Sequence, residues 1–168
     1  MGLPRILKNM NAYHNGVSYL GQVPEIALPK LALALEDYRA GGMIGNVKVN
    51  MGVEGMEMEI KAGGAIVLPY MTFGGPINAD TFLWMGAYEA DDSGKVTAVE
   101  ITTRGRFSEI DPGSAKPGDK TEESYKQALT YYKRVENGVP IVEIDMLNMK
   151  FITGGVDRYA EIRNAIGL

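Results

Sequence analysis

The residues with the sharpest chemical pattern run from Gly113 to Thr121 and read GSAKPGDKT. They nearly match the phosphate-binding pattern Gly-x4-Gly-Lys-Ser/Thr, in which backbone N–H groups surround a phosphate. Here Asp119 is inserted between Gly118 and Lys120, so a carboxylate would stand where the N–H groups should face the phosphate. Pro117 also removes one backbone donor. We therefore favour a polar loop that joins two strands.

Two pairs of carboxylates have a spacing that could support acid–base catalysis. Glu57 and Glu59 lie two residues apart, as do Glu143 and Asp145, so each pair shares one face of a strand. Glycosidases use such pairs, but they also need a cleft and aromatic platforms for the sugar. Solvated strand faces explain both pairs more simply, and an acidic face that lines a channel is a third interpretation.

The scarcity of other catalytic side chains excludes several classes of site. The chain has no cysteine and a single histidine, His14, which excludes thiolate nucleophiles and metal sites that need several imidazoles. His14 sits in the turn-like run 11–16, and the chain has no Gly-x-Ser-x-Gly elbow. We expect a solvated loop histidine, and we expect no catalytic, cofactor-binding or metal-binding residue.

Length and charge set the broad class of the protein. The 168 residues are enough for one domain, 1–168. With 21 acidic and 17 basic side chains, the net charge is −4, which argues against a protein that binds nucleic acid electrostatically. The sequence has no apolar run of the length that a membrane helix needs, and residues 1–11 lack the apolar centre of a secretory signal. We expect a soluble protein that is made in the cytoplasm and does not bind membranes by itself.

Alternating polar and apolar residues predict that most of the chain forms strands. Pro24 and Pro29 interrupt the first of these segments, which predicts a bent or edge strand. Residues 91–94, Asp-Asp-Ser-Gly, form a hairpin turn by composition and have too few spaced oxygens for a calcium loop. The predicted strands are 23–35, 46–51, 56–62, 81–90 and 95–110. The second and third of them have one apolar face and one polar, solvent-exposed face.

The remaining segments predict one more hairpin and two helices. Residues 125–135 fit a helix or a strand, and the Asn-Gly turn at 137–138 favours a strand. Residues 65–71 are apolar on every side and predict a short buried helix, although Pro69 leaves a buried strand possible. Asp157 can cap a C-terminal helix that ends at Gly167 and has Tyr159, Ile162 and Ile166 on one face. The fold class is mostly β, an antiparallel sandwich or barrel with an open edge and two short helices.

The sequence resembles the major tail tube proteins of contractile-tailed phages and of R-type bacteriocins such as R-pyocins. The resemblance extends over nearly the whole chain. The order of the matching runs along the chain is more specific to the family than any single run. In the first half the matching runs are Leu28–Leu31, Glu36–Met43, Val47–Glu54 and Met56–Glu57. In the second half they are Arg104–Gly105, Glu109–Gly113, Lys116–Gly118, Tyr131–Lys133, Glu143–Asp145, Gly155–Asp157 and Arg163–Leu168.

This resemblance implies a structural protein without catalysis or cofactor. Its subunits would form six-membered rings that stack into a hollow tube inside a contractile sheath, and edge strands of neighbours would join into one inner barrel. The tube would deliver DNA or puncture a membrane. Partners would be further copies of the chain and the sheath, tape-measure, baseplate hub and tail terminator proteins, with DNA only as passing cargo. The protein would reside in a virion tail or bacteriocin particle, assembled in the host cytoplasm.

Two groups of residues are the candidate sites of such a tube protein. We expect 36–45 to be an extended loop that contacts neighbouring subunits or the next ring, because its glycines permit close approach and Tyr38 and Arg39 are typical anchors. Its interface residues are Glu36, Asp37, Tyr38, Arg39, Gly41, Gly42 and Met43. We expect Glu57, Glu59 and Lys61 to face the lumen, where acidity would repel DNA phosphates. The alternative is a soluble β-barrel that binds a small ligand, or a hydrolase that uses Gly113–Thr121 or a carboxylate pair.

Overall fold

The computed structural model describes residues 2–168, and these residues form twelve strands and two short helices. The long strands are β1 (Arg5–His14), β4 (Leu33–Tyr38), β5 (Val47–Val53), β6 (Met56–Ala62), β7 (Asp80–Ala90), β8 (Lys95–Asp111), β9 (Glu123–Glu136) and β10 (Val139–Asp145). The short elements are β2 (Val17–Ser18), β3 (Glu25–Ala27), α1 (Val67–Thr72), β11 (Lys150–Thr153), β12 (Val156–Asp157) and α2 (Ala160–Ala165). None of the helices in residues 2–168 is long and apolar enough to span a membrane.

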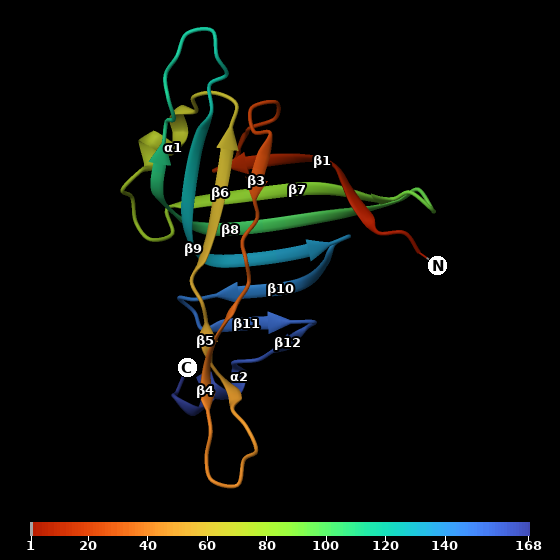
Figure 1. Ribbon diagram of the computed structural model, residues 1–168, viewed down its shortest axis with the longest axis vertical. Helices are drawn as coiled ribbons and strands as arrows, with labels where there is room; N and C mark the ends of the chain where they lie inside the picture. The colour runs from red at the N-terminus through yellow and green to blue at the C-terminus, as the bar shows by residue number, and fades with distance from the viewer. Residues whose placement is uncertain (1) are drawn as a thin grey trace.

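Most strands belong to one ten-stranded antiparallel sheet that bends sharply along β8 and β9. The first half of β9 pairs with β6, whereas its second half pairs with β10. The bend produces two parts, which cross each other in Figure 1. We call β3, β6, residues 123–129 of β9 and 106–111 of β8 the upright sheet. The transverse sheet consists of β1, β7, the first part of β8, the second half of β9, and β10 to β12.

Gly105 makes the bend in β8 possible. The register between β8 and β9 shifts at Arg104 and Gly105, where the two strands turn from the transverse into the upright sheet. A Cβ atom at Gly105 would lie 2.0 Å from the backbone oxygen of Ala128. Only glycine allows the two backbones to approach this closely.

The hydrophobic core lies between the two sheets. The transverse sheet contributes Phe82, Trp84, Val99 and Ile101, and the upright sheet contributes Met56, Met58, Ile60, Phe107, Tyr125 and Leu129. The apolar residues of β6 alternate with polar ones, so one face of this strand is buried and the other faces outward. Burying apolar surface is the main driving force for this packing.

The predicted strands are largely confirmed, and the ambiguous segment 125–135 is strand β9. The expected helix at 65–71 is α1, displaced by one or two residues. Segment 23–35 is not one strand: only β3 and the start of β4 are regular, because the two prolines cannot donate to a ladder. The prediction for Asp157 was wrong in detail, since it lies on β12 and accepts a hydrogen bond from the N–H of Tyr159 at 3.1 Å.

The expectation of a solvated His14 was wrong. The side chain is fully buried at the end of β1. Its Nε2 lies 2.7 Å from Oδ1 of Asp80, and its Nδ1 lies 2.8 Å from the hydroxyl of Tyr19. The ring also packs edge-on against Phe107. A buried imidazole needs partners for both nitrogens, and these two provide them.

Candidate assembly surfaces

The outward face of the upright sheet is polar and is at least partly exposed. The predicted residues Glu57, Glu59 and Lys61 lie on this face of β6, as the alternation of the strand required. Strand pairing extends the face to both sides, because residues paired across neighbouring strands point the same way. We call this surface the wet face; its charged members are Glu25, Glu57, Glu59, Lys61, Arg106, Glu109, Asp111 and Lys126.

Sequence reasoning had missed the basic members of the wet face outside β6. Lys126 lies on β9 directly opposite Glu59, and Arg106 lies on β8 opposite Ala128. Two loose ion pairs cross the strands, from Lys61 to Glu25 at 3.6 Å and from Lys126 to Glu109 at 3.9 Å. Lys126 lies between the buried residues Tyr125 and Gln127, so alternation could have identified it once the strand order was known, whereas the register shift between Phe107 and Glu109 breaks the alternation on β8.

Both lateral edges of the upright sheet are open in the described chain. On one side, β3 pairs only with β6, and its other edge has no partner strand. On the other side, β7 pairs with β8 only as far as Gly105, so residues 106–111 have β9 on one edge and no strand on the other. Unpaired strand edges present free N–H and C=O groups that can pair with another chain.

Strands β4 and β5 form a separate two-stranded arm that projects from one end of the molecule (Figure 1). Segment 36–45 is therefore not simply a loop. Glu36, Asp37 and Tyr38 belong to β4, while the turn that follows contains Arg39, Gly41, Gly42 and Met43. The predicted interface residues are thus brought together at the outer half of one hairpin. Strand pairing fixes them there because β5 supplies the hydrogen-bond ladder.

Both faces of the arm are exposed, against the expectation of one buried apolar face on β5. Asp37 pairs with Lys48 at 2.8 Å on one face. The other face has Tyr38, Val47 and Val49 in exposed positions, and Ile44 stands fully exposed at the tip. No second layer of the described chain covers these side chains. Exposed apolar surfaces of this kind are typical of interaction sites.

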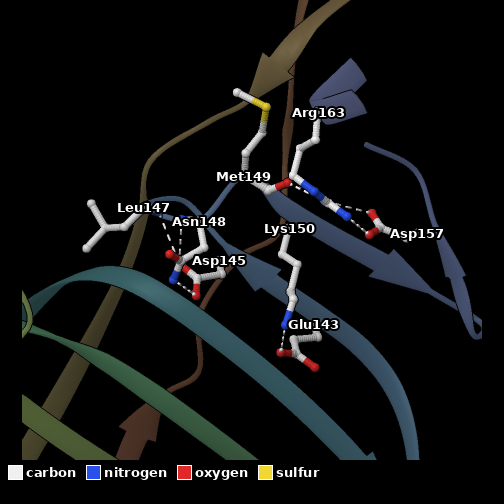
Figure 2. A network of polar contacts seen from close by, with 8 residues as sticks. All are labelled: Glu143, Asp145, Leu147, Asn148, Met149, Lys150, Asp157 and Arg163. Atoms are coloured by element: carbon white, nitrogen blue, oxygen red, sulfur yellow. Dashed lines mark hydrogen bonds and ion pairs between the residues drawn. The ribbon is translucent and has the colours of Figure 1, made fainter. Parts of the chain in front are cut away.

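A network of polar contacts attaches the C-terminal segment to β12 and to the turn that follows β10 (Figure 2). Arg163 binds the carboxylate of Asp157 and donates to the backbone oxygen of Met149 at 2.7 Å. The hydrogen bond from Arg163 holds the pKa of Asp157 below its ordinary value. Lys150 and Glu143 form a longer ion pair at 3.9 Å. The network connects α2 to β11 and β12.

Asp145 stabilises the turn that follows β10 and does not face solvent as expected. It is buried, and its carboxylate accepts hydrogen bonds from the N–H groups of Leu147 and Asn148, both at 3.1 Å, and from the Asn148 side chain at 2.7 Å (Figure 2). Burial alone would raise the pKa of Asp145, but these hydrogen bonds hold it below its ordinary value. The pair Glu143 and Asp145 is therefore structural.

Two segments with enzyme-like sequence patterns lie in connections between strands. Residues 113–121 lie in the irregular connection from β8 to β9, as expected, and Lys116 pairs with Asp119 at 3.5 Å. The turn at 91–94 is a β-hairpin turn between β7 and β8. Within residues 2–168 there is no cluster of three or more His, Asp or Glu side chains that could hold a metal ion.

Open sheet edges, a polar outer face and an exposed apolar arm are features typical of one class of protein, the subunit of a larger assembly. The family model for phage tail tube protein FII matches residues 4–167, and the chain belongs to this family. The chain is 39% identical to the tail tube protein of Escherichia phage P2 over 173 residues, covering all of both chains. It is 34% identical to the major tail tube protein of Serratia phage KSP20 over 174 residues, covering 100% of this chain and 99% of that protein.

Solved structures share the fold at low sequence identity. A chain in the sheath/tube terminator of an extracellular contractile injection system, PVC, in the extended state, superposes with a TM-score of 0.59 at 8% identity, covering 79% of this chain and 96% of that chain. A chain in the baseplate of the anti-feeding prophage superposes with a TM-score of 0.51 at 12% identity, covering 80% and 97%. The role of the chain is structural, in the tube of a phage-type tail. The alternative of a ligand-binding barrel or hydrolase has no support.

Proposed function

We propose that copies of this chain form six-membered rings by pairing the open edge of β8 with the β3 edge of the neighbouring copy, and that the rings stack into a hollow tube. The observation that carries this proposal is the pair of open edges on the upright sheet. A heterologous contact whose rotation closes makes a ring. Joining every edge to a neighbour removes the exposed strands that would otherwise invite aggregation.

Strand direction supports this closure. Within one copy β3 is antiparallel to β6, β6 to β9, and β9 to β8. Strand β3 is therefore antiparallel to β8, and rotation about a ring axis along the strands preserves that relation between copies. The joined sheets then form one antiparallel barrel with four strands from each subunit. No strand would have to change its partner or direction within the subunit.

In this ring the wet face lines the lumen. The opposite face of the upright sheet is covered by the transverse sheet, which would fill the channel if that face pointed inward. The wet face therefore points toward the barrel interior. Five acidic and three basic side chains give the face a formal charge of −2 per copy. A negative lining repels DNA phosphates, so the DNA can pass without binding to the channel wall.

The arm of β4 and β5 contacts a subunit of the same or the next ring. Its exposed apolar face and the anchors Tyr38 and Arg39 need a cover that the described chain does not supply. The sheath, tape-measure, baseplate hub and terminator proteins would be the further partners in a tail or bacteriocin particle. The function is geometric, without a catalytic step.

Negative-stain electron microscopy of the purified protein tests this function. We expect rings or hollow tubes of uniform width, formed at high protein concentration. A monomer that stays unassembled at high concentration and in the presence of its sheath and baseplate partners would contradict the proposal.

A further inference from the structure

Helix α1 and the loop after it carry an apolar patch that no described residue covers. The exposed members are Val67, Met71, Phe73 and Ile77, with Met71 75% and Phe73 54% exposed. We call these four residues the α1 patch. A concentration of exposed apolar side chains on such a short segment is unusual for a surface that stays in water.

The other side of α1 is firmly attached, which fixes the direction of the patch. The backbone N–H of Ile66 donates to the hydroxyl of Tyr125 at 3.1 Å, and Tyr70 donates to the carboxylate of Glu123 at 3.3 Å. Tyr125 donates to the same carboxylate. Burial and the nearby carboxylates of Glu123 and Asp111 raise the pKa of Tyr70, which keeps this hydroxyl protonated as a donor.

These contacts place α1 on the core side of the upright sheet, at the flank where β8 has its open edge (Figure 1). Glu123 and Tyr125 are at the start of β9, and Asp111 ends β8 directly beside them. A strand added to the open edge of β8 would bring its own subunit against α1.

The opposite flank of the molecule has a groove lined by apolar side chains together with Lys8, Asn9 and Gln22. It has a volume of about 500 Å³ and lies between β1 and the segment that leads into β3. Its apolar lining consists of Leu7, Met10, Leu20, Val23 and Pro24. Leu20 is largely exposed, and Val23 continues directly to the open edge strand β3. Because the groove lies beside β1, which belongs to the transverse sheet, it is also on the core side of the upright sheet, but at the other edge.

We infer that the α1 patch of one copy occupies the groove between β1 and β3 of the neighbouring copy in the ring. This inference rests on the proposed function and assigns a second layer to the same contact. The patch lies behind the β8 edge and the groove lies behind the β3 edge, so one rotation brings both pairs together. The barrel contact supplies backbone hydrogen bonds, and the α1 contact supplies the apolar burial that stabilises association.

Site-directed cross-linking of assembled tubes tests the inference, because the chain has no cysteine of its own. The variant with Met71→Cys and Leu20→Cys is assembled and treated with a short bismaleimide cross-linker. We expect a ladder of covalent oligomers up to a complete ring on a denaturing gel. Each single variant should give at most a dimer. The control pair combines Met71→Cys with Val139→Cys, whose position is exposed on β10 of the transverse sheet, and should give no ladder.

The outcomes separate this inference from the proposed function. Tubes of the double variant that give no ladder, or a ladder equal to that of the control pair, overturn the α1 contact and leave the tube intact. Failure of the unsubstituted protein to form tubes overturns the function itself. Should the double variant not assemble, hydrogen exchange on the unsubstituted protein decides. We expect assembly to slow the exchange of backbone amide hydrogens at least tenfold in both segments, 66–77 and 20–24. An unchanged exchange rate in either segment refutes the contact.

Discussion

The buried contact between His14 and Asp80 yields the most demanding prediction about how this subunit is held together. Replacing His14 with alanine removes the partner of Asp80 Oδ1 at 2.7 Å and of the Tyr19 hydroxyl at 2.8 Å. Both partners stay buried, because Asp80 is fully enclosed and Tyr19 nearly so. The variant therefore leaves the Asp80 side chain and the Tyr19 hydroxyl without these hydrogen bonds in the core.

The expected loss of unfolding free energy is about 4 kcal/mol. Leaving a buried hydrogen-bonding group without its partner costs about 1–3 kcal/mol, because that group stays desolvated, and this variant leaves two such groups. The imidazole also packs against Phe107 with ring centroids 5.2 Å apart, so its removal leaves a cavity. With a urea dependence of about 2 kcal/mol/M, the unfolding midpoint should fall by about 2 M.

Urea unfolding of the unassembled protein measures this change. Trp84 is the single tryptophan of the chain and is buried in the core, so its fluorescence reports global unfolding. The control is Lys8→Ala, which removes an exposed ion pair to Asp91 at 2.8 Å and should leave the midpoint unchanged. A fall of less than about 0.5 M for His14→Ala would refute the structural role of the pair.

Three further predictions concern the bend, the C-terminal network and the arm. Gly105→Ala should lower the unfolding free energy by at least about 2 kcal/mol in urea titrations, because its Cβ would lie 2.0 Å from a backbone oxygen of β9. Asp157→Asn should weaken the acid dependence of stability. The pKa of Asp157 is lowered from 3.8 by Arg163, so the paired carboxylate stabilises the fold above 3.8 and this stabilisation is lost as the pH falls through the lower folded-state value. The double variant Tyr38→Ala and Arg39→Ala should lower tube yield by electron microscopy several-fold without changing the urea midpoint of the unassembled protein.

Each of these predictions has a contrasting outcome. Gly55→Ala is the control for the bend, since a Cβ at Gly55 would meet no atom within 4 Å, and equal effects of the two variants would contradict the crowding argument. For Asp157→Asn, a stability difference from the unsubstituted protein that does not shrink as the pH falls below 4 would contradict the assigned pKa direction. Unchanged tube yield in the double variant would remove the arm from the interface.

Alternation along the chain was enough to predict strand β6 and its outward polar face. In β6 the sequence MEMEIKA places every second side chain in the core, and the structure follows that pattern without a break. The same reasoning placed β7, β8 and the turn between them. Local periodicity succeeds here because the partner strands come from the same chain and bury the face that the pattern marks as apolar.

Long-range contacts explain what could not be predicted. The partner of His14 is Asp80, 66 residues away, and nothing in the run 11–16 indicates that burial. The bend at Gly105 depends on the approach of β9, which no local pattern encodes. On β5 the alternation predicts an apolar face that the chain itself does not cover. A periodic pattern cannot distinguish an apolar face that is buried by its own chain from one that the subunit leaves exposed.

A cryo-electron microscopy reconstruction of assembled tubes tests the central claim most directly. We expect β3 of each subunit to pair with residues 106–111 of its neighbour, and Glu57, Glu59 and Lys61 to line the channel. A map in which either edge remains unpaired within the ring, or in which these three side chains point outward from the tube, would contradict it.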